Sequence, residues 1–234
     1  NIAEIFDFKG GFRKIPLKKE ILSLGIPSAM EQISYNFSQT IITAIIASLG
    51  TIAVSSKIYT QTITSFIFSI GVAAGVSGNL VIGNFYRNKD FQKIKNFGVI
   101  NANRISLIAA GVNLILALLG RFLVGIFTKD PEITSIVSQL LFFQILLDPM
   151  RVANEILVNS LNVLKDVKFP VVVGIITTYA LVIPFSYLFV SKLGMGLRAV
   201  WIIFILDEAL RRLLFTIRFK SGKWMRINEV DDGY

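Results

Sequence analysis

The sequence consists largely of long apolar runs, each long enough to cross the hydrocarbon core of a bilayer, which is about 30 Å thick. Of its 234 residues, 53% are hydrophobic and only 17% are charged, a composition outside the range of soluble domains. The sequence therefore predicts an all-α, polytopic membrane protein. We expect six transmembrane helices, at about 18–48, 51–86, 97–120, 131–160, 168–190 and 197–219.

The segments between these runs carry ordinary boundary signals. "SLGT" at 48–51 predicts a tight turn, and "FTKDPEI" at 127–133 offers Asp130 as the N-cap of a helix with Pro131 in its first turn. Residues 87–97 predict either a short amphipathic helix on the membrane surface or a solvated loop. We expect residues 1–17 to form a cytoplasmic linker and 220–234 a cytoplasmic tail. Because the chain begins with Asn, we also expect it to be a fragment.

Basic residues are distributed unevenly over the connecting segments. The N-terminal segment, the second and fourth loops and the tail together hold fifteen Lys and Arg residues, whereas the alternate loops hold four. The positive-inside rule therefore predicts that both termini face the cytoplasm, in a multi-pass protein of the cell (inner) membrane. The net charge of +9 is then a topological signal facing anionic lipid, and we expect no nucleic-acid partner.

The sequence contains no Cys and no His. Thiol nucleophiles, imidazole acid–base chemistry and most transition-metal sites are therefore excluded. We expect no catalytic residue, no metal site and no cofactor, and hence no enzyme.

The last apolar run carries charges in its middle, at "DEALRR". An ionised side chain at membrane depth costs about 2.5 to 3.5 kcal/mol on insertion scales, so these groups should face protein or water. Each acid precedes an arginine by four positions, the order that helices favour. The spacing predicts two structural ion pairs, Asp207 with Arg211 and Glu208 with Arg212, buried against neighbouring helices. The alternative is that this face belongs to a transport pathway.

Polar residues form stripes at helical spacing on the first, second and fourth runs. Such stripes favour a hydrated cavity, the alternative being helix-to-helix hydrogen bonds without one. The candidate substrate or ion pathway comprises Glu31, Tyr35, Asn36, Gln61, Asp148, Arg151, Asn154 and Glu155. On the fourth run, Arg151 is spaced to pair with either Asp148 or Glu155, which would give a two-state element; a static triad is the alternative. Gly71, Gly75 and Gly78 form a small-residue face that predicts close helix packing.

Five stretches in order resemble the C-terminal half of a multidrug and toxic compound extrusion (MATE) family transporter. They are "LSLGIPSAMEQISYNFSQTIITAIIASLGT" at 22–51, "GVSGNLVIGNFYRNKDFQKI" at 75–94, "FTKDPEI" at 127–133, "DPMRVANEILVNSLNVLKDVKFPV" at 148–171 and "DEALRRLLFTIRFKSGKW" at 207–224. The resemblance implies one six-helix lobe of a twelve-helix antiporter, with helices seven to twelve in this chain. An N-terminal six-helix lobe would be its partner, with membrane lipid around both.

Family branches that use a cation site in this lobe have a glutamate eight positions after the proline of the seventh helix. Here that position is Tyr35, and the family's tenth-helix aspartate position, ten residues before Leu161, is Arg151. The family's acidic pair is therefore absent from these positions.

The resemblance still implies a cation-coupled antiporter, driven by Na⁺ or H⁺, that exports small organic cations by rocker-switch alternating access. One alternative is a lipid-linked saccharide flippase, in which Lys57 and Arg151 would bind a diphosphate. The other alternative is a non-transporting membrane scaffold.

Overall fold

The structure is a computed structural model that describes residues 15–225; in the first helix it describes side chains from Gly25 onward, except those of Pro27, Ser28 and Glu31. This part of the chain is helical throughout, with short turns and no strand. The π-helical segment η2 joins α6 to α7, and a second π-helical segment, η3, continues α7, so that Lys168–Lys192 is one continuous stretch. The elements are α1 (Ile15–Ala47), α2 (Thr51–Arg87), α3 (Phe91–Leu118), α4 (Gly120–Phe127), α5 (Pro131–Val163), α6 (Lys168–Thr177), η2 (Thr178–Val182), α7 (Ile183–Tyr187), η3 (Leu188–Lys192) and α8 (Gly196–Ser221).

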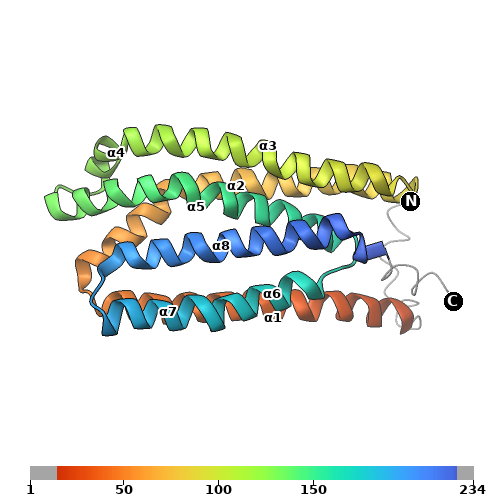
Figure 1. Cartoon of the computed structure of the whole chain (residues 1–234), viewed down its shortest axis with the longest axis horizontal. Helices are drawn as coiled ribbons and strands as arrows, with labels where there is room; N and C mark the ends of the chain where they lie inside the picture. The colour runs from red at the N-terminus through yellow and green to blue at the C-terminus, as the bar shows by residue number, and fades with distance from the viewer. Residues whose placement is uncertain (1–14, 226–234) are drawn as a thin grey trace, which may run out of the picture.

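The long helices lie side by side in an elongated bundle (Figure 1). α3 forms one edge, α1 and the α6–α7 stretch form the opposite edge, and α2, α5 and α8 lie between them. α5 is the central helix, since it packs against α2, α3, α4 and α8. The start of α1, the α2–α3 turn, the α5–α6 turn and the end of α8 all lie at one end of the bundle.

The turn and cap predicted from the sequence are confirmed. Ser48 and Leu49 form the turn after α1, and Gly50 adopts a φ of 99°, a region that favours glycine. At the start of α5, Asp130 Oδ1 accepts hydrogen bonds from the backbone N–H groups of Glu132 at 2.8 Å and Ile133 at 3.2 Å. These bonds satisfy two donors that a helix N-terminus otherwise leaves free.

The small-residue face of α2 packs directly against α5, as its glycines predicted. A Cβ atom added to Gly71 would lie 3.0 Å from Val152 Cγ2, and one added to Gly75 would lie 3.1 Å from Asn159 Nδ2. Both distances are shorter than ordinary van der Waals contact, so α2 and α5 approach this closely only because these positions carry no side chain.

Four helical stretches of the described chain are long and apolar enough to cross a membrane: α2, α3, α5 and the continuous stretch Lys168–Lys192. α1 and α8 are also long, with 33 and 26 residues, but neither contains a stretch as apolar and as poor in charged residues as those four. α1 carries one of the polar stripes and α8 carries the "DEALRR" charges. The count of six spans therefore stays a prediction.

The prediction for residues 87–97 is wrong in both of its forms. Arg87 ends α2, Asn88 to Asp90 form a turn, and residues 91–97 form the first two turns of α3, which runs on without a break. Ile94 is fully buried, and the ring of Phe91 packs edge-on against Trp224 at a centroid distance of 6.0 Å. The apolar side of this segment thus packs against protein, because the residues after α8 fold back beneath it.

Candidate functional site

A hollow of about 310 Å³ lies between α1, α5, α6 and α8. A smaller hollow of about 50 Å³ adjoins it, since the two share Tyr35, Arg151, Glu208 and Arg211 in their walls. The smaller one also reaches Gln61 of α2. Charged and polar side chains that are far apart in the sequence therefore meet around one continuous space within the helical bundle.

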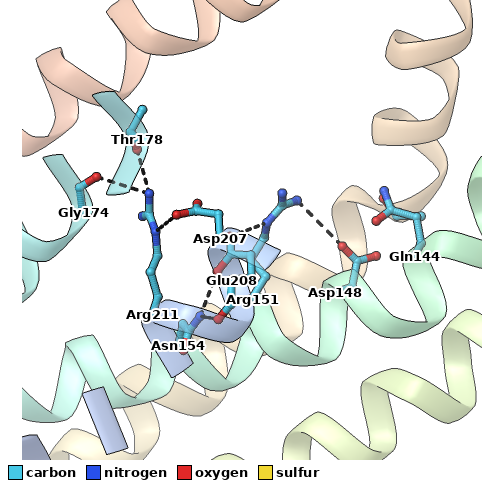
Figure 2. Close-up of polar contacts among 10 residues, drawn as sticks. Gln144, Asp148, Arg151, Asn154, Gly174, Thr178, Asp207, Glu208 and Arg211 are labelled. Carbon is cyan, nitrogen blue, oxygen red and sulfur yellow. Dashed lines mark hydrogen bonds and ion pairs between the residues drawn. The ribbon is translucent and has the colours of Figure 1, made fainter. Parts of the chain in front are cut away.

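Arg151 of α5 lies at the centre of the first charged network (Figure 2). Its Nε donates to Glu208 Oε1 of α8 at 3.3 Å, and its Nη1 lies 3.7 Å from Asp148 Oδ1. Asn154 Nδ2 donates to Glu208 Oε2 at 2.8 Å and to the Glu208 backbone carbonyl at 2.9 Å. Glu208 is therefore held by two side chains of α5, and these contacts join the middle of α8 to α5.

Arg211 of α8 forms the second network, on the side toward α6 (Figure 2). Its Nε donates to Asp207 Oδ1 at 3.0 Å, so the first ion pair predicted from the sequence is confirmed. Its Nη2 donates to Thr178 Oγ1 at 2.7 Å and to the Gly174 carbonyl at 3.2 Å. Arg211 thus connects α8 to the point where α6 gives way to the π-helical segment η2, a geometry often found at functional sites.

The second predicted ion pair is wrong: Glu208 pairs with Arg151 of α5 and not with Arg212. Arg212 instead donates to the Ala153 carbonyl at 3.4 Å and to Asn103 Oδ1 of α3. The four-residue spacing permits a local pair, but Arg151 and Asn154 of α5 contact Glu208, while Ala153 of α5 and Asn103 of α3 accept from Arg212. Tertiary packing therefore separates the two side chains.

Glu155 has a different environment from the one that its spacing suggested. Its Oε1 and its backbone carbonyl accept from Asn159 Nδ2 at 2.8 and 2.9 Å. Among the described residues it forms no ion pair, and the acids that contact Arg151 are Asp148 and Glu208. Glu155 nevertheless lines the larger hollow and presents a carboxylate to it.

Beneath the hollow, α5 buries polar groups whose hydrogen-bonding capacity is not fully used. Asp148 is 3% exposed; its Oδ2 accepts no hydrogen bond of normal length from the described residues, and the buried amide of Asn113 of α3 faces the carboxylate. Gln144, one turn away, donates to Thr64 Oγ1 of α2 at 3.4 Å, but its own Oε1 likewise accepts none from residues 15–225. Figure 2 places the two side chains next to each other on α5. Two buried acceptors without such a bond are costly, which makes this position suited to a proton or a small cation.

The structure brings five of the eight predicted pathway residues to the walls of the hollows: Tyr35, Gln61, Arg151, Asn154 and Glu155. Asp148 lies behind the wall, and Asn36 is exposed but is not a wall residue. The side chain of Glu31 falls outside the described residues.

Sequence reasoning missed Gly174 and Thr178. Both line the larger hollow and both accept from Arg211. A glycine and a threonine in an apolar run carry no distinctive signal, so only the packing of α8 against α6 could identify them.

Lys57 of α2 is buried at the contact with α1, one turn from Gln61 of the smaller hollow. Its side chain is 4% exposed and its Nζ donates to Thr43 Oγ1 of α1 at 2.6 Å. It is not a wall residue of either hollow. Lys57 therefore stabilises the contact between α1 and α2 and presents no charge to the site.

The family model for MatE matches residues 27–188, which is more than half of the chain. The chain belongs to the MATE transporter family. It is 38% identical over 208 residues to the "Uncharacterized transporter YisQ" of Bacillus subtilis (strain 168), a match that covers 89% of this chain and 46% of that protein. It is 27% identical over 213 residues to the "Probable multidrug resistance protein NorM" of Thermotoga maritima, covering 88% of this chain and 45% of that one.

Solved MATE structures share the fold. The bent form of the Vibrio cholerae MATE transporter VcmN superposes with a TM-score of 0.79 at 17% identity, over 88% of this chain and 47% of that one. A MOP superfamily transporter from Pyrococcus furiosus, described as having a binding pocket of reverse polarity, gives 0.75 at 18% identity over 93% and 48%. The MATE chain described here spans about half the length of the relatives it matches. The family consists of integral membrane transporters, in keeping with the expectation that the chain is not an enzyme.

Proposed function

We propose that this chain is the C-terminal half of a cation-coupled antiporter that exports small organic cations by rocker-switch alternating access. The larger hollow between α1, α5, α6 and α8 is its share of the substrate pathway. A second six-helix lobe, related to this one, covers the hollow from the side of α1. The resistance proteins named NorM among its relatives support an efflux role.

The charge distribution around the hollow carries this proposal. Each arginine of the site already serves an acid: Arg151 contacts Glu208 and Asp148, and Arg211 contacts Asp207. Glu155, which lines the same hollow, has only an amide as its partner among the described residues. The site thus holds four acids and two arginines, and an excess of carboxylate in a low-dielectric space attracts cations.

The need for a second lobe follows from exposure. Tyr35, a wall residue of both hollows, is 53% exposed, and the neighbouring Asn36 is exposed as well. Polar surface of this kind is unfavourable against lipid, where no water completes the hydrogen bonds. A partner lobe that shares the cavity resolves this, and the chain's length relative to its relatives leaves room for one.

Coupling by Na⁺ or H⁺ fits the same residues. Asp148 has a buried oxygen that accepts no hydrogen bond of normal length from the described residues, and its other oxygen lies 3.7 Å from Arg151. A cation bound at Asp148 would weaken that contact and favour the pairing of Arg151 with Glu208. The coupling ion and the substrate would then favour different partners of Arg151, and this competition is what exchange of one for the other requires.

The two alternatives receive less support from this geometry. A lipid-linked diphosphate needs free cationic groups, but Arg151 and Arg211 are engaged and Lys57 is not a wall residue of either hollow. A scaffold without transport has no need of a carboxylate such as Glu155 at the wall of a hollow of about 310 Å³.

The deciding experiment measures export of a fluorescent organic cation from proteoliposomes that contain the full-length gene product. Imposed Na⁺ and pH gradients should each be tested as the driving force. Glu155→Gln keeps the shape and the acceptor oxygen but removes the charge, so cation affinity should fall about 10- to 100-fold, the value of one charge-assisted contact. Glu132→Gln, on the same helix but exposed at its first turn, should leave affinity unchanged.

Folded yield, read by size-exclusion chromatography, separates loss of binding from loss of structure. Export that is indifferent to both gradients would contradict the coupling. Tight binding of an undecaprenyl diphosphate sugar together with no export of the cation would instead support the flippase. If the protein transports neither compound and water does not reach Glu155, the result would support the non-transporting scaffold.

A further inference from the structure

The outward face of α3 carries a charge that the transport site does not use. The buried residues of α3, which include Ile94, Gly98 and Ala102, face α5 and α8, whereas Ile100 and Leu107 on the other side are 47% and 75% exposed. Arg104 stands in this apolar, exposed face and forms no ion pair with any residue that the structure describes. An arginine in such a position is costly in lipid unless its head reaches the membrane surface or an anion.

The position of Arg104 along α3 indicates where its head goes. It lies 13 residues after Phe91, which is about 20 Å along the axis at the rise of an α-helix. Side chains on a helix lean toward its N-terminus. By this rule the side chain of Arg104 leans over Ile100 toward the end of the bundle that holds the α2–α3 turn, while Lys95, nine positions back, lies on the opposite side of α3 at 100° per residue.

A hollow of about 460 Å³ lies at that end, between the first turns of α3 and the last turn of α8. It is lined by Gln92, Lys95, Asn96, Val99, Ile100 and Lys220. Lys95 is half-buried and Lys220 is exposed, and neither forms an ion pair within residues 15–225. The one acid at the start of α3, Asp90, already accepts from Lys93 at 2.8 Å.

The residues that line this hollow change character along α3. Gln92, Lys95 and Asn96 lie nearer the α2–α3 turn, and Val99 and Ile100 lie one turn further along α3, where the exposed apolar face continues to Leu107. Basic groups next to an apolar wall match an amphiphile with an anionic head. A free anion would leave the apolar wall uncovered, and a neutral lipid would leave the lysines without a partner.

We propose that this hollow binds an anionic phospholipid. Its phosphate lies between Lys95 and Lys220, and one acyl chain runs along Val99, Ile100 and Leu107. The lipid comes from the leaflet that the α2–α3 turn faces, which is the inner leaflet under the positive-inside prediction. α3 and the α1 edge lie on opposite sides of the bundle (Figure 1), so a second lobe over the transport hollow leaves this face to lipid.

The test uses the full-length gene product, delipidated in dodecyl maltoside. It is titrated with phosphatidylglycerol, with phosphatidylcholine of the same chains, and with inorganic phosphate. Phosphatidylglycerol should remain bound in native mass spectrometry and raise the Tm by about 5 °C or more, as expected for a ligand well above its Kd. Phosphatidylcholine and inorganic phosphate should shift the Tm by less than about 1 °C.

Two charge-matched variants locate the site. Lys95→Gln with Lys220→Gln should weaken phosphatidylglycerol binding about 25-fold, since each basic group near an anionic head contributes about fivefold. Arg121→Gln with Lys129→Gln, exposed at the opposite end of the bundle, should leave binding unchanged. Should the first variant fold poorly, the exposed Lys220→Gln alone still predicts a fivefold loss.

Several outcomes would overturn the proposal. Equal binding of the two lipids would mean that this face binds lipid without selectivity for the headgroup. An equal effect of inorganic phosphate would make this a site for free anions. Unchanged affinity in both lysine variants would place the lipid elsewhere on the protein.

Discussion

The contact between Glu208 and Arg151 gives the sharpest test of the structure, because the local rule predicts a different partner for Glu208. Glu208→Gln is the informative change. Glutamine has nearly the same shape and can still accept from Asn154, so the variant removes the charge and little else. Arg151 is then left with Asp148, 3.7 Å away.

The size of the effect follows from the geometry. Two unit charges 3.3 Å apart attract by about 5 kcal/mol at an effective dielectric constant of 20. The side chains of Arg151 and Glu208 retain 29% and 14% of their exposure, so water in the hollow reduces this value. Hydrogen bonds to charged groups contribute about 1.5 to 3 kcal/mol net, and we expect a coupling energy of about 2 kcal/mol.

A double-mutant cycle isolates that energy. Arg151→Gln, Glu208→Gln and the double variant are compared with the unaltered protein by thermal unfolding, followed by circular dichroism in detergent. For a domain of about this size, 1 kcal/mol corresponds to roughly 2 to 4 °C in Tm, so Glu208→Gln should lower the Tm by about 4 to 8 °C. The double variant should be less destabilised than the two single effects added together.

The matched cycle replaces Arg151 with Arg212, the partner that helix spacing predicts. Because Arg212 donates to Asn103 and Ala153, its coupling to Glu208 should stay within about 0.5 kcal/mol, the error of additivity. If Glu208 couples to Arg212 and not to Arg151, the arrangement of α8 against α5 described above is incorrect.

Two further substitutions probe the packing of the bundle by the same unfolding assay. Gly98→Ala would place a Cβ atom 2.4 Å from the ring of the buried Phe219, so it should destabilise the protein by about 1 to 3 kcal/mol. Gly111→Ala, with nothing within 4 Å, should be neutral or slightly stabilising, and equal effects at both sites would refute this packing. Asp166→Asn removes the charge that accepts two hydrogen bonds from Arg218, at 2.7 and 3.1 Å. Because Asp166 is only 2% exposed, this change should cost about 3 kcal/mol, and a loss under about 0.5 kcal/mol would mean that the pair is solvated.

Much of the helical framework could be predicted from the sequence, because its signals are local. Asp130 followed by Pro131 marks the start of α5, and the hydrogen bonds that cap it involve residues two and three positions away. The glycines of α2 mark the face that meets α5, since a position without a side chain is the condition for that approach. The Asp207–Arg211 pair is also local, four residues apart on one helix.

Charged and polar residues within helices limit how well the sequence predicts the number of membrane spans. The number of membrane spans remains open where α1 and α8 are concerned, because polar groups that line a cavity lower the apolar signal of the helices that carry them. Composition cannot distinguish a helix that is polar because it lies in water from one that is polar because it faces a cavity within protein. That distinction depends on the neighbouring helices.

The sequence by itself determined most of the long helices, the cap of α5 and the residue types that would surround a polar space. Only the tertiary structure decided which polar groups meet between helices: Arg151 with Glu208 across 57 residues, and Arg211 with Thr178 across 33. Helical periodicity states which side chains share a face but not which face of another helix lies opposite. That choice is made by the packing of α5 between α2, α3 and α8, where the burial of many apolar side chains outweighs any single ion pair.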